Sequence, residues 1–367
     1  MAKLRSLELG RFIAAMLVML SHAAPYVNAH GAGPMFGGLL FPGPLGVQYF
    51  FVLSGFVMAS AHHADFGRLA AVPQFWWRRA CRIYPAYWLA LCIPVFYLYK
   101  ATTPGIALHM VLLDPWYGQE YIPATWSLRL EMAFYIMFGL CLLPYIGRLL
   151  LGGWVFLTLW IWVLAAIAPF HPPLLGTLVH LSLVHAADFF SLFEVYFFAG
   201  LAAGYAYVKW HFTWRIWAGL LIAGALLFAR LLPMEGWGVL YGSHPPFVLG
   251  MAAALAVLLL GLAGLERAGG FRLGRWAGWL GAISYPVYIF HEPVMLVITN
   301  ELHWGQYGTI GLYAHFALLC GAILGLSALV TFLFDQPVQR VLRRLTRRIW
   351  RQPGPGLTPL YSSNPGH

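Results

Sequence analysis

The chain has 367 residues, of which 61% are hydrophobic and only 9% are charged. A soluble domain carries about 25% charged residues, so this composition excludes an ordinary soluble protein and indicates a polytopic membrane protein. The formal net charge is +10, but the basic residues flank apolar runs. That distribution argues against a nucleic-acid partner and for contact with membrane lipid.

About ten apolar runs are long enough to span a membrane, and they predict an all-α polytopic bundle of transmembrane helices. Residues 1–345 are expected to form one transmembrane domain. Residues 346–367 are expected to form a cytoplasmic tail, first basic and then rich in Pro and Gly, without fixed structure. The approximate limits of the runs are 9–26, 44–61, 83–99, 126–144, 153–169, 187–208, 216–232, 246–264, 279–298 and 308–334.

The distribution of Lys and Arg predicts the orientation. With the N-terminus in the cytoplasm and strict alternation of the spans, only Lys100, Arg129 and Arg230 fall on or near the outer side. An even number of spans then places both termini in the cytoplasm, and the bundle in the cytoplasmic (inner) membrane. The basic stretch from Arg340 is expected to lie on anionic lipid at most.

The first span carries an arginine at its start and a histidine near its end. On a helix, Arg11 and His22 share one face and lie about 16 Å apart along the axis. An ionisable side chain inside a span is a functional hypothesis by default. Two other interpretations stay open. In the first, the segment is a signal peptide that is cleaved off. In the second, His22 only forms a hydrogen bond to a neighbouring helix.

The next two spans add a packing motif and a cationic pair. Gly46, Ser54 and Gly55 in the second span are typical of helices that approach closely. Arg79 and Arg82 are three residues apart and therefore share a helix face at the cytoplasmic end of the third span. Arginine matches the geometry of phosphate, which suggests a phosphate site. The alternative is a basic flank that contacts lipid phosphate.

Later spans add ionisable groups toward the outer side. Glu131 lies about one and a half turns into the fourth span, at a depth similar to that of His22, and needs a partner there. His291 and Glu292 fall in the outer third of the ninth span. We therefore expect His22, Glu131 and His291 in one layer and the arginines in a second layer nearer the cytoplasm. This arrangement suits transfer of a small group from a phosphorylated cytoplasmic donor to an outer acceptor.

The histidines and cysteines show no metal-binding spacing such as HExxH, so no metal is expected. The cysteines lie in or beside apolar runs without close pairing, and we interpret them as apolar residues with no disulfide. They are Cys81, Cys92, Cys141 and Cys320.

Five motifs occur in order along the chain. Together they resemble the acyltransferase family 3 membrane proteins, over roughly residues 4–345. The resemblance implies an enzyme that O-acylates sugars and other hydroxyl-bearing acceptors with acyl-CoA. It also implies that His22 is the catalytic histidine and that Arg11, Arg79 and Arg82 lie near the donor. The motifs are Arg11-x10-His22, FFVLSGF at 50–56, Arg79-x-x-Arg82 followed by Pro85, WSLxxE at 126–131 and SYxxYxxH at 284–291.

The sequence departs from the family pattern in two places. The last span of the family usually ends in Glu-x-Pro, whereas this chain has Asp335-Gln336-Pro337, so no role is carried over to Asp335. The SGNH-type hydrolase domain that is fused to some members is absent. Either another protein is therefore expected to carry out a second acyl-transfer step, or there is no such step.

We expect His22 to act as a general base on the acceptor hydroxyl while that oxygen attacks the acyl thioester. Glu131 is expected to orient the imidazole and to stabilise the imidazolium. An acyl-histidine intermediate is the competing chemistry. Acetyl-CoA is the expected donor, and a carbohydrate or lipid-linked sugar is the expected acceptor. The candidate substrate-binding residues are Trp126, Ser127, Tyr285 and His291.

A different class of function also accommodates the buried ionisable groups. In a transporter or flippase, His22 and Glu131 would form a proton relay, but phosphate-binding arginines at the cytoplasmic side fit that function less well. A purely structural scaffold would need no buried ionisable groups.

Overall fold

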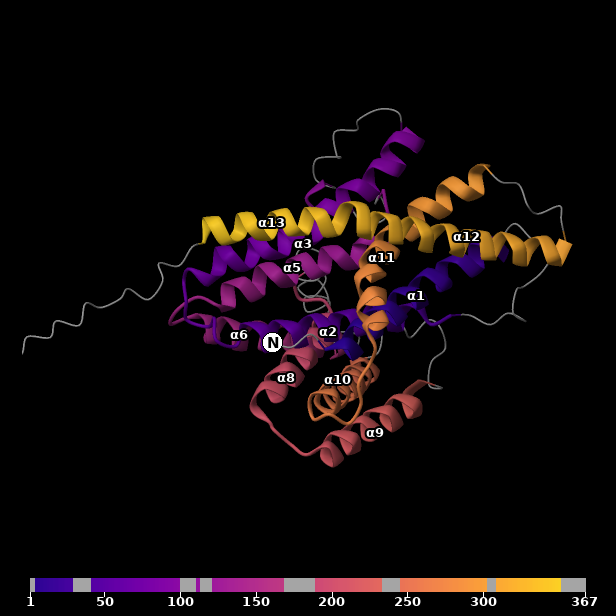
Figure 1. The fold of residues 1–367 in the computed structure, drawn as a ribbon. Helices are drawn as coiled ribbons and strands as arrows, with labels where there is room; N and C mark the ends of the chain where they lie inside the picture. The colour runs from indigo at the N-terminus through magenta and orange to yellow at the C-terminus, as the bar shows by residue number, and fades with distance from the viewer. Residues whose placement is uncertain are drawn as a thin grey trace, which may run out of the picture.

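The computed structural model describes residues 4–28, 41–99, 110–112, 121–167, 189–232, 245–301 and 308–350, and every regular element within these ranges is helical. Each predicted apolar run corresponds to a helix in the bundle (Figure 1). The predicted tail begins at residue 346, but α13 continues to Ile349. Residues 351–367 lie outside the described residues. The bounds are α1 Arg5–Asn28, α2 Gly43–His62, α3 Ala71–Pro94, η2 Val95–Tyr99, α5 Thr125–Cys141, α6 Gly147–Ile167, α8 Glu194–Lys209, α9 Trp214–Leu231, α10 Pro245–Arg267, α11 Arg275–Glu301, α12 Gly308–Val330, η6 Thr331–Asp335 and α13 Gln336–Ile349.

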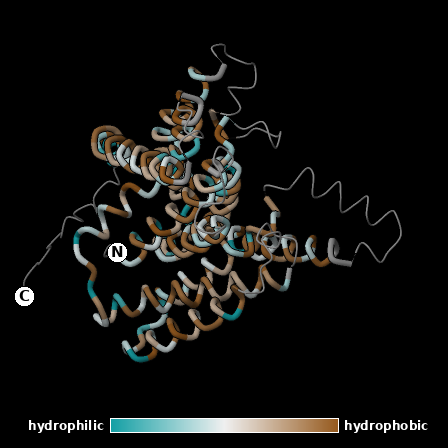
Figure 2. Tube along the Cα trace, turned by 90° about the vertical axis from the view of Figure 1, so that its right-hand side faces the viewer, coloured by the Kyte–Doolittle hydropathy of each residue, from teal (hydrophilic) through white to brown (hydrophobic). Residues whose placement is uncertain are grey.

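Six described segments are long and apolar enough to cross a membrane. Apolar residues recur along the helices (Figure 2), and many large apolar side chains on the outside, such as Phe96 and Leu333, are exposed. Such a surface suits contact with lipid. The other long helices are shorter or carry more charge, so length and composition alone do not reach the predicted number of about ten. The six segments are Arg5–Pro25, Gly43–His62, Trp214–Leu231, Pro246–Arg267, Arg275–Ile298 and Ile310–Ile349.

The centre of the bundle is formed by close helix pairs. Helix α2 packs most closely on α8, and α1 packs on both α11 and α2. A Cβ atom on Gly55 would collide with the carbonyl oxygen of Phe197, and one on Gly200 would collide with the carbonyl oxygen of Val52. The predicted packing role of Gly55 is therefore confirmed, because the backbones of α2 and α8 meet where neither has a side chain.

The end of α10 connects two other helix ends. The carboxylate of Glu266 accepts hydrogen bonds from the backbone N–H groups of Arg5 and Ser6, at 2.9 Å each. It thereby satisfies orphan donors at the start of α1. The guanidinium of Arg267 donates to the carbonyl oxygens of Tyr207 and Trp210, at 2.5 Å each, at the end of α8. The Glu266 bonds fix α1, which carries Arg11 and His22, against α10, and the Arg267 bonds do the same for the end of α8.

The last span does not end where the sequence predicts. The predicted apolar run ends at residue 334, but the helix continues through the π-helical segment η6 into α13 (Figure 1). The N–H of Gln336 donates to the carbonyl oxygen of Thr331, five residues back. Pro337 lies in the first turn of α13, where its missing N–H is tolerated. Asp335 therefore lies inside a continuous helix.

Candidate active site

A cavity of about 460 Å³ lies among α1, α2, α3, α5 and α11. Its wall brings together the three predicted arginines, Arg11, Arg79 and Arg82, with the carboxylates of Glu8 and Glu131. The cations come from α1 and α3, which are separated in the sequence by the whole of α2. The predicted convergence of the three arginines is therefore confirmed.

Arg82 is held by Asp335, a partner that sequence analysis did not predict. Its Nη1 lies 3.2 Å from Oδ2 of Asp335, a carboxylate in η6 that is almost completely buried. Its guanidinium carbon also lies 5.3 Å from the ring centroid of Tyr285. The hydroxyl of Tyr285 donates to the carbonyl oxygen of Ile83 at 2.8 Å, which fixes that ring. Tyr285 thus supports Arg82 in addition to lining the cavity.

Arg79 is held from a different direction. Its Nη2 donates to Nε2 of His62 at 3.2 Å, and Nδ1 of His62 donates to Oδ2 of Asp65 at 2.8 Å. The guanidinium carbon lies 5.4 Å from the ring centroids of both Phe75 and Tyr135. Sequence reasoning missed His62 and Asp65, although a histidine and an aspartate three residues apart at a helix end are a recognisable signal.

Glu131 belongs to the arginine cavity, which corrects the predicted layering. Its Oε1 accepts hydrogen bonds from Ser54 at 2.8 Å and from the hydroxyl of Tyr135 at 2.5 Å. The carboxylate that contacts His22 is that of Glu292. The predicted pairing of Glu131 with His22 is therefore wrong. Two residues at a similar depth can lie on sides of their helices that do not face each other.

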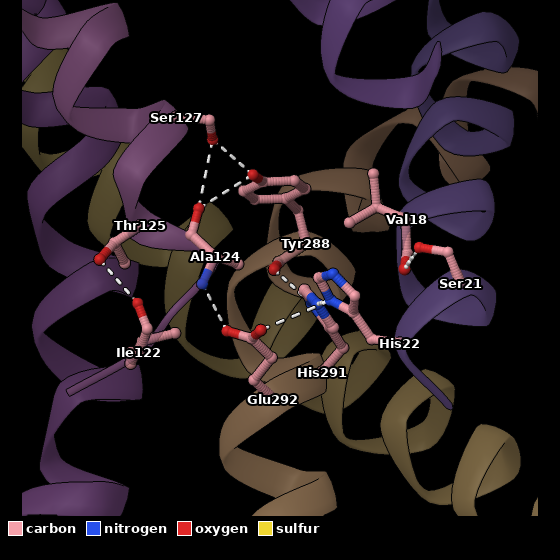
Figure 3. Close-up of polar contacts among 10 residues, drawn as sticks. All are labelled: Val18, Ser21, His22, Ile122, Ala124, Thr125, Ser127, Tyr288, His291 and Glu292. Atoms are coloured by element: carbon pink, nitrogen blue, oxygen red, sulfur yellow. Dashed lines mark hydrogen bonds and ion pairs between the residues drawn. The ribbon is translucent and has the colours of Figure 1, made fainter. Parts of the chain in front are cut away.

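His22 contacts His291 and Glu292 of α11 (Figure 3). Nδ1 of His22 lies 2.9 Å from Nε2 of His291 and 3.4 Å from Oε1 of Glu292. The two imidazoles are stacked, with ring centroids 5.1 Å apart. His291 is completely buried, whereas the His22 side chain is 38% exposed. The predicted proximity of His22 and His291 is confirmed, and only His22 of the pair is accessible.

Glu292 also binds the start of α5. Its Oε2 accepts the backbone N–H of Ala124 at 2.5 Å (Figure 3). A carboxylate at this position satisfies an orphan donor and interacts favourably with the helix dipole. Sequence reasoning noted Glu292 beside His291 in the outer third of its span but gave it no role.

Tyr288 connects this cluster to the cavity. Its backbone carbonyl accepts a hydrogen bond from Nδ1 of His291 at 2.6 Å. Its hydroxyl lies 2.5 Å from Oγ of Ser127 and donates to the carbonyl oxygen of Ala124 at 3.0 Å (Figure 3). Tyr288 and Ser127 both line the cavity. Trp126 instead packs on Phe193, with ring centroids 5.2 Å apart.

The His22 cluster has the donor types of a metal site, since one ligand atom each from His22, His291 and Glu292 lies within 4.8 Å of the others. Two nitrogens that share a tetrahedral zinc ion, with Zn–N bonds of about 2.0–2.1 Å, lie about 3.3 Å apart. The observed 2.9 Å between the histidine nitrogens is a hydrogen-bond distance. The geometry therefore fits a hydrogen-bonded pair better than a zinc site.

Comparison with known families decides the classification. The profile of a family described as an acyltransferase domain matches residues 4–332, which is most of the chain. The chain belongs to acyltransferase family 3. Because this membership agrees with the apolar helices, the protein is an integral membrane acyltransferase.

Relatives of this family member include proteins from three organisms. The exopolysaccharide production protein ExoZ of Rhizobium meliloti (strain 1021) is 28% identical over 348 residues, which cover 90% of this chain and 97% of ExoZ. The acyltransferase MdmB of Streptomyces mycarofaciens is 32% identical over 155 residues, which cover 38% of this chain and 39% of MdmB. Protein 2 in the picA locus of Rhizobium radiobacter is 31% identical over 160 residues, which cover 42% of this chain and 71% of that protein. No solved structure matches the chain.

Proposed function

We propose that the protein transfers an acyl group, with acetyl as the expected group, from cytoplasmic acyl-CoA to a hydroxyl of a carbohydrate or lipid-linked sugar of the cell envelope. One observation carries this proposal. A cavity that gathers three arginines shares Tyr288 with the cluster around an accessible histidine. The name of the relative ExoZ, an exopolysaccharide production protein, supports a carbohydrate acceptor.

The proposed topology has about ten spans in the inner membrane, with both termini in the cytoplasm. It is supported by the strong bias of Lys and Arg toward one side of the alternating spans. In this topology α3 enters the membrane from the cytoplasm, and its arginines lie near that surface. Donor and acceptor then approach the site from opposite sides.

The arginines are proposed to bind the phosphates of CoA. Guanidinium groups form bidentate hydrogen bonds to phosphate, and cations in a low-dielectric cavity attract an anion strongly. Glu131 keeps part of the cationic charge balanced and connects α5 to α2 through Ser54. Its role is therefore proposed to be electrostatic support of the donor site.

The transfer is proposed to use His22 as the general base. The imidazole takes the proton of the acceptor hydroxyl while the oxygen forms a bond to the thioester carbonyl carbon. The carbon–sulfur bond then breaks, and the leaving CoA thiolate takes the proton from the imidazolium. The products are the O-acylated acceptor and free CoA thiol. An acyl-histidine intermediate would release the thiol before the acceptor binds.

Purified protein in detergent tests this function with acetyl-CoA and a thiol reagent. We expect thiol release that depends on an added carbohydrate acceptor, together with acetyl transfer to that acceptor detected by mass spectrometry. Thiol release without acceptor, in an amount equal to the enzyme, would indicate the acyl-histidine route. Binding of acetyl-CoA without transfer to any acceptor in a panel of envelope glycans would contradict the proposal and favour a transporter.

A further inference from the structure

The hydrogen bonds of His291 determine which of its nitrogens carries the proton. Nδ1 of His291 lies 2.6 Å from the carbonyl oxygen of Tyr288. A carbonyl oxygen only accepts hydrogen bonds, so Nδ1 of His291 is the protonated nitrogen. In the neutral ring, Nε2 of His291 then carries a lone pair. This nitrogen faces His22 at 2.9 Å (Figure 3).

The orientation of His22 follows from that of its neighbour. Nδ1 of His22 faces two acceptors, the lone pair of His291 and Oε1 of Glu292. It must therefore carry a proton, which it donates to them. In the neutral imidazole the lone pair is then on Nε2. The partly exposed ring of His22 thus always carries its lone pair on the same nitrogen, Nε2.

Glu292 adds charge and rigidity to this arrangement. Its two oxygens are used separately, one toward Nδ1 of His22 and the other by the N–H of Ala124 at the start of α5. A carboxylate beside the N–H of an imidazole stabilises the imidazolium that forms when the ring takes a proton. The bond to Ala124 holds that carboxylate in place.

We propose that His291 and Glu292 are positioning residues that select the Nδ1–H tautomer of His22 and so make its Nε2 the general base. This inference rests on the proposed function of His22. During transfer, Nε2 takes the acceptor's proton and later gives it to the CoA thiolate, while the Nδ1 proton stays on the ring. Sequence analysis expected Glu131 to orient the imidazole and to stabilise the imidazolium. We assign that role instead to the adjacent residues His291 and Glu292 of α11.

Substitutions of His291 test the tautomer assignment. His291→Leu removes the acceptor, and we expect kcat to fall by about 10–100-fold, by analogy with the loss of outer-shell partners that orient metal-bound histidines. The KM for acetyl-CoA should stay within about threefold, because the ground-state donor contacts are elsewhere. His291→Gln keeps an acceptor near the position of Nε2 and should recover most of kcat. The matched control His211→Leu, at an exposed site between α8 and α9, should match wild type.

Two further variants separate positioning from folding. Glu292→Gln can still accept the Ala124 N–H but has no charge, and we expect a loss of about tenfold or more in kcat at normal thermal stability. The double variant His22→Ala/His291→Leu should be no slower than His22→Ala alone, because His291 acts only through His22. An additive loss would mean that His291 has an independent structural role and would contradict the proposal.

The outcomes distinguish this inference from the function on which it rests. If His22→Ala keeps transfer activity, the proposed function itself fails. If His22→Ala is inactive while His291→Leu and Glu292→Gln keep wild-type kcat, only the positioning role is refuted. Dialysis against a chelator should leave kcat unchanged. A loss that is restored by zinc would overturn the proposal, since a metal on Nδ1 of His22 is incompatible with a proton there.

Discussion

Each of two arginines in the cavity is held by its own partners before any donor is present. Arg79 binds His62 and lies beside two aromatic rings, whereas Arg82 pairs with the buried Asp335. Pre-ordered guanidinium groups lose little side-chain freedom when an anion binds. The site therefore offers guanidinium groups in a fixed geometry.

Removing Arg79 should weaken donor binding directly. Hydrogen bonds to charged groups contribute about 1.5–3 kcal/mol, so we expect Arg79→Ala to reduce acetyl-CoA affinity about 10–100-fold. Arg79→Lys should recover only part of the affinity, because it lacks the planar fork. Calorimetry on purified protein measures this, with exposed Arg272→Ala as the matched control. Equal affinity in Arg79→Ala and wild type would mean that the cation serves only membrane topology.

Removing Arg82 should have a second effect, on stability. The Asp335 side chain is 3% exposed, and without Arg82 its charge loses its cationic partner. We expect Arg82→Ala to lower stability by about 1–3 kcal/mol, seen as earlier thermal unfolding in detergent. Adding Asp335→Asn should restore the unfolding temperature but not the donor affinity. Recovery of both together would show that Arg82 does not contact the donor.

The sequence identified most of the residues of the site but not all of their contacts. Motif order and the helical period placed Arg11 and His22 on one face of α1. Depth along a helix, however, does not determine which neighbouring helix a side chain faces. Glu131 therefore lies with Ser54 and Tyr135, while Glu292, next to a histidine already singled out, reaches His22. Asp335 could not be paired because its partner is far away in sequence.

The packing of the helices around the site depends on how closely α2 and α8 approach each other. The bounds of most helices follow from apolar runs, which is why the helical assignment could be predicted. The continuation of α12 through η6 could not, since a proline usually signals a helix end. The π-helical turn accommodates Pro337, and it directs Asp335 toward α3.

A single methyl group at the crossing of α2 and α8 tests this packing. Gly55→Ala places Cβ against the backbone of Phe197, and overpacking of this kind costs about 1–3 kcal/mol. We expect a lower unfolding temperature and loss of transfer activity. The control Gly152→Ala in α6 meets no atom within 4 Å and should be neutral or slightly stabilising. Equal stability of the two variants would mean that the crossing is not close.

The proposed transfer requires donor and acceptor sites that open to opposite sides of the membrane. The positive-inside bias supports this, and family membership over residues 4–332 makes acyl transfer the relevant reaction. The number of spans is not determined by composition, because helices such as α5 are short and carry charge.

Cysteine labelling tests the topology. In a background without native cysteines, Arg68→Cys and Arg272→Cys should react with a membrane-impermeant reagent only after the cytoplasmic side is exposed. Ile310→Cys, at the 87% exposed start of α12, should react from the outer side. All three reacting from one side would refute the alternating arrangement of about ten spans.

The most direct test of His22 as the general base compares His22→Ala with wild type for both acetyl-CoA binding and acyl transfer. The arginine cavity does not include His22, so we expect normal membrane insertion and normal donor affinity. Transfer should fall by about 10²–10⁴-fold, the usual contribution of a general base. Transfer close to the wild-type rate by a correctly folded His22→Ala protein would contradict the assignment of His22 as the base.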